Sequence, residues 1–189
     1  LRGDGMASDL TEWEAMVKRA KNPKYKIKIA LVGKYVELHD AYLSVAEALC
    51  HGGIVNDTKV DIKWVHSERL EQEDMDLSSV FSDIDGIIVP GGFGERGIEG
   101  MIKTIKYARE NKIPFFGIGV GMQCAVVEIA RNVCGLKDAH TTEVNPKTPH
   151  PIIDFPPEEK AAKVLGAMRL GSYPCHVLAD TRAMAAYGE

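Results

Sequence analysis

The sequence predicts a three-layer, doubly wound α/β domain with a mostly parallel sheet. Short β-rich segments alternate with segments of helical composition, which is the pattern of βαβ units. Two of the β-rich segments run directly into glycine-rich turns that precede helices. In folds of this kind, ligands bind at the carboxyl ends of the strands, so functional residues are sought there.

Length and composition are those of an ordinary globular protein. The 189 residues include 23 Lys and Arg against 27 Asp and Glu, a net charge of −4, and 45% are hydrophobic. A mildly acidic chain lacks the basic face expected of a nucleic-acid-binding protein. No apolar run reaches the roughly 18–20 residues of a membrane span. We therefore expect a cytoplasmic protein with neither a nucleic-acid nor a membrane partner.

The chain is predicted to begin with an arm, residues 1–24, that contains a short helix. Four apolar residues at helical spacing mark this helix: Leu10, Trp13, Met16 and Val17. Asn22-Pro23 ends it, because the residue before a proline is biased away from helical backbone. The domain itself is expected to cover residues 25–189.

The domain is predicted to alternate between strands and helices. The predicted strands are 27–32, 60–65, 86–89 and 114–118. The predicted helices are 41–50, stopped by His51-Gly52-Gly53, then 98–110 and 122–133. Residues 145–160 hold five prolines and are predicted to form an irregular surface loop, after which apolar content resumes over 161–171.

A first glycine loop, PGGFGERG, follows the predicted strand 86–89 and contains Gly92-x-Gly94-x-x-Gly97. It has the form of a dinucleotide-binding fingerprint, but it does not follow the first strand, and no acidic residue ends the next strand about 20 residues on. Two other uses stay open. Its backbone N–H groups could stabilise a developing negative charge as an oxyanion hole, or the loop is a tight turn that merely needs glycine.

A second glycine loop, Gly117-x-Gly119-x-Gly121, joins a predicted strand to a predicted helix. It has the form of a nucleophile elbow, in which a Ser or Cys stands between two glycines on a sharp turn. Here the central residue, Gly119, has no side chain. Cys124 lies five residues further on, rotated by about 140° at ~100° per residue, so we predict a core cysteine there rather than a nucleophile.

Four cysteines are present, and no two form a C-x-x-C pair: Cys50, Cys124, Cys134 and Cys175. None lies beside a histidine at zinc spacing, so we expect no metal site. We expect reduced thiols that are mostly small core residues.

Five segments together resemble the class I glutamine amidotransferase family, and more narrowly the glutaminase domain of CTP synthases. They are ALVGKYVELHDAY (30–42), VPGGFGERGIEG (89–100), PFFGIGVGMQ (114–123), TTE (141–143) and GAMRLG (166–171). The resemblance covers roughly residues 25–189 and implies a flavodoxin-like fold. It also implies that residues 1–24 link this domain to an amidoligase (synthase) domain.

The resemblance implies a mechanism. A cysteine at the elbow attacks the side-chain amide of L-glutamine and forms a glutamyl thioester. Ammonia travels to the synthase domain, which aminates UTP to CTP with ATP and Mg²⁺, and GTP acts as an effector. No cofactor is implied in the glutaminase domain itself.

Carried over by position, Gly119 occupies the nucleophile position, where Cys is expected. The resemblance assigns the oxyanion hole to the N–H groups of Gly92 and Val120. The implied substrate-binding residues are Gly92, Val120, Gly121, Met122, Gln123 and Glu143. Lys34, Tyr35, Asp40 and Tyr42 follow the first strand and are expected to face the synthase partner or a nucleotide effector.

The sequence departs from the family pattern in three ways. Glycine replaces the nucleophile, residues 151–165 are short where the family has a lid that responds to GTP, and the histidine and glutamate of the triad have no counterpart. We therefore expect the C-terminal part of the domain to be missing.

Gly119 has three possible explanations, which are natural loss, an engineered knock-out or a chemically modified cysteine. The intact elbow around it favours the last two.

Three functions compete. The first is the CTP synthase glutaminase. The second is a catalytically dead module that binds glutamine or a nucleotide. The third is another elbow hydrolase, such as a cysteine peptidase-like protein, which the PGGFGERG and GAMRLG segments argue against.

Overall fold

The computed structural model describes residues 8–155, 172 and 174–187. The GAMRLG segment and the apolar stretch 161–171 lie outside the described residues. The chain forms two compact parts, Leu1–Asp154 and Phe155–Glu189, and each is described by itself.

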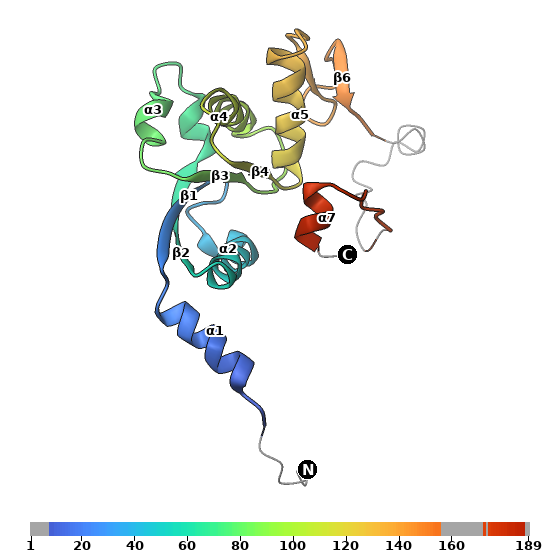
Figure 1. Cartoon of the computed structure of the whole chain (residues 1–189). Helices are drawn as coiled ribbons and strands as arrows, with labels where there is room; N and C mark the ends of the chain where they lie inside the picture. Colours follow the sequence, from blue (N-terminus) through green and yellow to red (C-terminus); the bar gives the residue numbers. More distant parts are fainter. Residues whose placement is uncertain (1–7, 156–171, 173, 188–189) are drawn as a thin grey trace. The chain divides into compact units, whose positions relative to one another are not determined.

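The first part is built on a four-stranded parallel sheet (Figure 1). The strands are β1 (Tyr25–Gly33), β2 (Thr58–His66), β3 (Gly86–Val89) and β4 (Phe115–Gly117), in the order β2-β1-β3-β4. The chain moves from β1 to one edge of the sheet and then returns past β1 to β3. This reversal places a topological switch point at the carboxyl ends of β1 and β3, where such folds bind ligands.

Helices cover both faces of the sheet, so the predicted three-layer, doubly wound fold is confirmed. The helix α2 (Leu43–Val55) lies on one face, and α4 (Ile98–Glu110) and α5 (Val120–Asn132) lie on the other (Figure 1). Successive residues of β1 serve the two layers, because side chains alternate across a strand. Ala30 and Val32 join the core under α4 and α5, whereas Leu31 joins the core under α2.

Smaller elements complete the first part. They are α1 (Thr11–Lys21), the 3₁₀ turns η1 (His39–Tyr42) and η2 (Ser67–Glu71), α3 (Leu77–Val80), and a separate two-stranded parallel sheet of β5 (Ala139–Thr141) and β6 (His150–Ile153). The second part contains α7 (Arg182–Tyr187). Among the described residues, no helix is both long and apolar enough to span a membrane.

Two predicted elements differ from the structure. The helix expected to stop at residues 51–53 runs through both glycines to Val55. A Cβ added at Gly53 would lie 2.5 Å from the Thr58 carbonyl oxygen, so this glycine lets α2 approach β2 and does not end the helix. Residues 150–153, expected to be irregular, form β6. Its Pro151 is tolerated because an edge strand can leave one ladder bond unmade.

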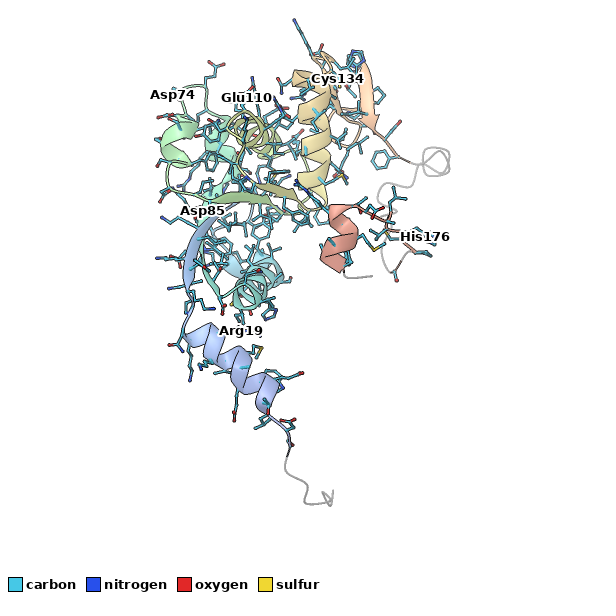
Figure 2. All side chains as sticks on the ribbon, in the orientation of Figure 1. Arg19, Asp74, Asp85, Glu110, Cys134 and His176 are labelled. Atoms are coloured by element: carbon cyan, nitrogen blue, oxygen red, sulfur yellow. The ribbon has the colours of Figure 1, made fainter. Side chains whose placement is uncertain are left out.

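The cysteine prediction is correct for one residue. Cys124 is buried in the core under α5, as expected. Cys50, Cys134 and Cys175 are exposed, so the expectation of mostly core cysteines is wrong. Figure 2 shows Cys134 just beyond one end of α5, at the end opposite to the turn from β4. The hydrophobic periodicity of a helix does not indicate whether a cysteine at its margin is covered.

Candidate active site

The turn between β4 and α5 has the geometry of a nucleophile elbow. Only Ile118 and Gly119 separate the last residue of the strand from the first residue of the helix. A Cβ added at Gly117 would lie 2.7 Å from the backbone of Gly121, and one added at Gly121 would lie 2.0 Å from the Val89 carbonyl oxygen. Glycine is therefore required at both flanking positions, because backbone passes where a side chain would stand.

Gly119 differs from its neighbours in space and in backbone conformation. A Cβ added there would meet only the Gly91 Cα, at 3.6 Å, which is an ordinary van der Waals contact. Its backbone, with φ 54° and ψ −113°, lies in a region that L-residues rarely adopt. Strained backbone of this kind is typical of an elbow nucleophile. The position accepts a side chain at the cost of backbone strain.

Two backbone donors lie beside position 119. The Gly91–Gly92 loop after β3 lies against the elbow, and Val120 opens α5. Neither the Gly92 nor the Val120 N–H donates a hydrogen bond to another described residue. The N–H of Gly121, by contrast, is held by the Ile118 carbonyl oxygen at 2.9 Å. Both donors are thus left without an acceptor among the described residues, as the N–H groups of an oxyanion hole must be before the substrate arrives.

Lys34 holds the first glycine loop in place through hydrogen bonds to its backbone. Its side chain is fully buried, and its Nζ donates to the carbonyl oxygens of Phe93, at 2.8 Å, and Gly94. Its stem would lie 3.4 Å from a Cβ added at Gly92. Burial lowers the pKa of Lys34, while the Glu143 carboxylate is among the groups that act in the opposite direction.

The expectation that Lys34 and Tyr42 face a partner or a nucleotide is wrong, because both side chains are buried. The Tyr42 hydroxyl accepts hydrogen bonds from the N–H groups of Lys34, at 3.1 Å, and Tyr35, at 3.3 Å. Burial raises the pKa of Tyr42, which keeps the hydroxyl protonated. Asp40 is exposed and Tyr35 half-buried, with the Arg96 guanidinium carbon 5.7 Å from the Tyr35 ring centroid. For these two residues the expectation stays a prediction.

The other residues assigned by resemblance lie on two elements. Met122 is exposed and Gln123 half-buried on the first turn of α5, next to the elbow. Glu143 is exposed in the turn after β5. The Glu143 carboxylate acts to raise the pKa of Lys34, the residue that holds the glycine loop. Glu143 nevertheless follows Gly92 by 51 residues in the chain.

Cys124 does not replace the missing nucleophile. It is 2% exposed, and burial raises its pKa to about 12, so its thiol stays protonated at neutral pH. Sequence reasoning missed the anchoring role of Lys34, because a lysine after an apolar strand is ordinarily a solvated loop residue. Within the described residues, no group of three or more His, Cys, Asp and Glu side chains could hold a metal ion.

The chain belongs to the class-I glutamine amidotransferase family, whose sequence model matches residues 37–186. Within this family it is similar to CTP synthases. It is 58% identical over 182 residues to the CTP synthase of Carboxydothermus hydrogenoformans and 60% identical over 174 residues to that of Ruminiclostridium cellulolyticum. These alignments cover 96% and 92% of this chain but 34% and 32% of the relatives. The chain thus spans about a third of the length of these relatives.

A solved structure places the similarity in one domain of those enzymes. The glutaminase domain of a Trypanosoma brucei CTP synthase, with bound acivicin, superposes with a TM-score of 0.64 at 42% identity. The match covers 68% of this chain and 49% of that one. The resemblance to a CTP synthase glutaminase domain, expected from the five sequence segments, is therefore confirmed.

Proposed function

We propose that this chain is the glutaminase region of a cytoplasmic CTP synthase. In that role the elbow holds L-glutamine, and a cysteine in place of Gly119 would form the glutamyl thioester, which water then cleaves to glutamate. The ammonia released on thioester formation passes to an amidoligase domain that aminates UTP to CTP. The observation that carries the proposal is the elbow at residues 117–121, flanked by two unpartnered backbone donors, in a chain similar to CTP synthases.

The described residues of the site have different proposed roles in substrate binding and in catalysis. The N–H groups of Gly92 and Val120 stabilise the negative oxygen that develops on the amide carbon during attack. Gly121, Met122 and Gln123 line the turn beside the substrate. The Glu143 carboxylate binds the α-ammonium group of glutamine. A hydrogen bond between these two charged groups is stronger than one between neutral groups.

With glycine at position 119, the chain lacks the sulfur that forms the thioester. It therefore binds glutamine without turning it over, and hydrolysis requires cysteine at this position. Neither binding nor attack on glutamine uses a cofactor in this domain. ATP and Mg²⁺ serve the synthase domain, and GTP is the proposed effector.

A second candidate is a catalytically dead module that binds glutamine or a nucleotide. Gly119 favours this candidate, because glycine supplies no nucleophilic side chain at the centre of the elbow. The two proposals share the glutamine-binding residues. They differ in whether cysteine at position 119 produces ammonia in the full-length protein.

Calorimetric titration with L-glutamine tests the shared part. We expect saturable binding, weakened about tenfold or more by Glu143→Gln, which removes a charge-assisted contact. Glu73→Gln is the matched control, because Glu73 is an exposed acid in the loop before α3. Binding of GTP or ATP without binding of glutamine would instead support a nucleotide-binding module. Ammonia release by the full-length Gly119→Cys protein then separates enzyme from dead module.

A further inference from the structure

Glu143 is carried by a tight turn that Thr141 holds together. The Thr141 carbonyl oxygen accepts from the Asn145 N–H at 3.0 Å, and its Oγ1 accepts from the Val144 N–H at 3.3 Å. The Thr141 N–H in turn donates to His140 Nδ1 at 2.9 Å. A series of hydrogen bonds thus connects His140 through Thr141 to the turn that contains Glu143.

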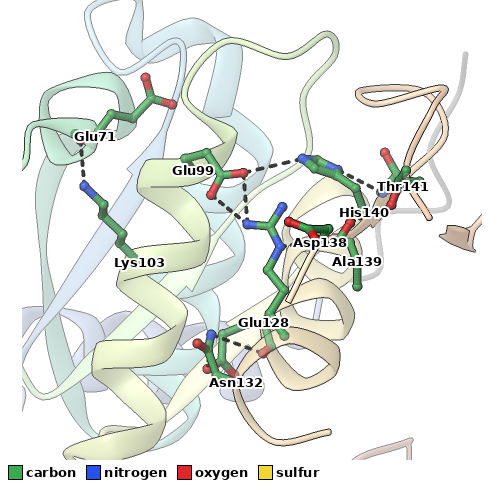
Figure 3. Close-up of polar contacts among 11 residues, drawn as sticks. Glu71, Glu99, Lys103, Glu128, Asn132, Asp138, Ala139, His140 and Thr141 are labelled. Carbon is green, nitrogen blue, oxygen red and sulfur yellow. Dashed lines mark hydrogen bonds and ion pairs between the residues drawn. The ribbon is translucent and has the colours of Figure 1, made fainter. Parts of the chain in front are cut away.

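His140 is a buried side chain that connects this turn to α4. Its Nε2 lies 3.5 Å from an oxygen of Glu99, which stands in the first turn of that helix. Figure 3 shows the Glu99 carboxylate with both His140 and a guanidinium group beside it. The guanidinium is that of Arg131 on α5, whose Nη1 donates to Glu99 at 2.8 Å and whose Nε donates to the Ala139 carbonyl oxygen at 2.8 Å.

These contacts fix the protonation state of the imidazole. Nδ1 accepts an N–H bond and so carries no proton, which leaves the proton on Nε2, facing Glu99. Burial lowers the pKa of His140, the Arg131 guanidinium acts in the same direction, and Glu99 opposes both. A second proton on Nδ1 would point at the Thr141 N–H and break the bond that anchors the turn.

The β6 strand and the residue that follows it contribute two further titratable groups. His150 pairs with Ala139 in register, and the Asp154 carboxylate accepts from the Thr142 hydroxyl at 2.7 Å. The second of these contacts also supports the turn. A test of His140 must therefore compare variants of that residue, because a pH profile alone would combine all of these groups.

We propose that His140 is a positioning residue for Glu143, and that only its neutral form holds the turn in the conformation that binds glutamine tightly. The inference rests on the proposed function, because it assigns Glu143 to the substrate ammonium. The affinity for glutamine then falls on acidification. The α-ammonium and α-carboxylate groups of the substrate keep their charges between pH 5 and pH 7 and contribute little to that change.

The test is calorimetric titration with L-glutamine at pH 7 and pH 5, for the parent chain and for two variants. His140→Asn keeps an acceptor oxygen for the Thr141 N–H but does not titrate, and His140→Phe removes the acceptor. We expect the parent to lose affinity between the two pH values, by at most about fivefold, the effect of one hydrogen bond. His140→Asn should match the parent at pH 7 and lose less at pH 5, whereas His140→Phe should be weaker at both. His51→Asn, which changes an exposed histidine on α2, should keep the parent profile.

Hydrogen exchange supplies a readout that does not depend on glutamine. The amide protons of Thr141 and Val144 should exchange faster in His140→Phe than in His140→Asn, with unchanged rates in the β1 strand. Identical pH profiles in the parent and His140→Asn would overturn this inference alone. Failure of the parent chain to bind glutamine at pH 7 would overturn the proposed function and this inference with it.

Discussion

Replacement of Gly119 by cysteine is the most informative single change. The added Cβ has space, since the nearest atom outside the turn is the Gly91 Cα at 3.6 Å. The cost comes from the backbone, because φ 54° with ψ −113° is strained for an L-residue by about 1–3 kcal/mol. We therefore expect Gly119→Cys to fold and to lose about 1–3 kcal/mol in its free energy of unfolding, measured by urea denaturation.

The introduced thiol should also be reactive. It would stand at the N-terminus of the 13-residue helix α5, beside the unpartnered Val120 N–H, and both features stabilise a thiolate. We expect it to react with iodoacetamide at pH 7 about fivefold faster than the exposed Cys50, because the gain in thiolate exceeds the loss of intrinsic nucleophilicity.

Mass spectrometry measures the site of alkylation in one tryptic peptide, residues 113–131. This peptide contains both position 119 and Cys124. The alkyl group should appear at position 119, while Cys124, with a pKa of about 12, should stay unmodified until the protein is denatured. An unfolded variant would refute the claim that space is available at position 119. A thiol that reacts no faster than Cys50 would refute the electrostatic argument for the elbow.

Three further changes test other contacts. Gly121→Ala should lower stability far more than Gly52→Ala in the same urea titration, because the first Cβ would lie 2.0 Å from a carbonyl oxygen and the second meets nothing within 4 Å. Arg109→Leu should lower stability in the same titration, since it removes the cation beside the fully buried carboxylate of Glu128 and leaves it only the Asn132 amide. A double variant with Glu128→Leu should recover most of that loss. Lysines on β1 and β2 lower the pKa of Asp83 to about 2, so its contribution to stability is complete above about pH 4 and is lost as the pH falls towards 2. Asp83→Asn should flatten that part of the stability profile.

The order of strands and helices could be predicted because each of those elements carries its own local pattern. Short β-rich segments marked the four strands of the main sheet, and segments of helical composition between them marked α2, α4 and α5. Gly53 shows the limit of such patterns. A glycine that ends a helix and a glycine that lets a helix pack against a strand look alike in sequence, and only the distance to the Thr58 carbonyl distinguishes them.

The glycine loops of the candidate site could be predicted from the sequence, whereas the roles of its buried side chains could not. The two glycine loops were found because close backbone approach requires glycine at fixed spacing. Lys34 has its role through a contact with Phe93, which is 59 residues away in the chain. His140 has its role through a contact with Glu99, which is 41 residues away. No local pattern encodes such contacts, so a buried lysine that holds a loop looked like a solvated residue facing a partner.

The geometry of the elbow also changes what its intact sequence implies. On sequence grounds alone, the preserved flanking glycines favour an engineered or modified residue at position 119 over natural loss. Gly117 and Gly121 are, however, required by packing, because a side chain at either would collide with backbone. Selection for stability alone retains both, whether or not the protein hydrolyses glutamine. Glycine at position 119, by contrast, relieves backbone strain, so loss of the nucleophile stabilises the fold. The preserved glycines therefore do not indicate how residue 119 came to be glycine, and the mass of the peptide 113–131 from the native protein is what identifies that residue.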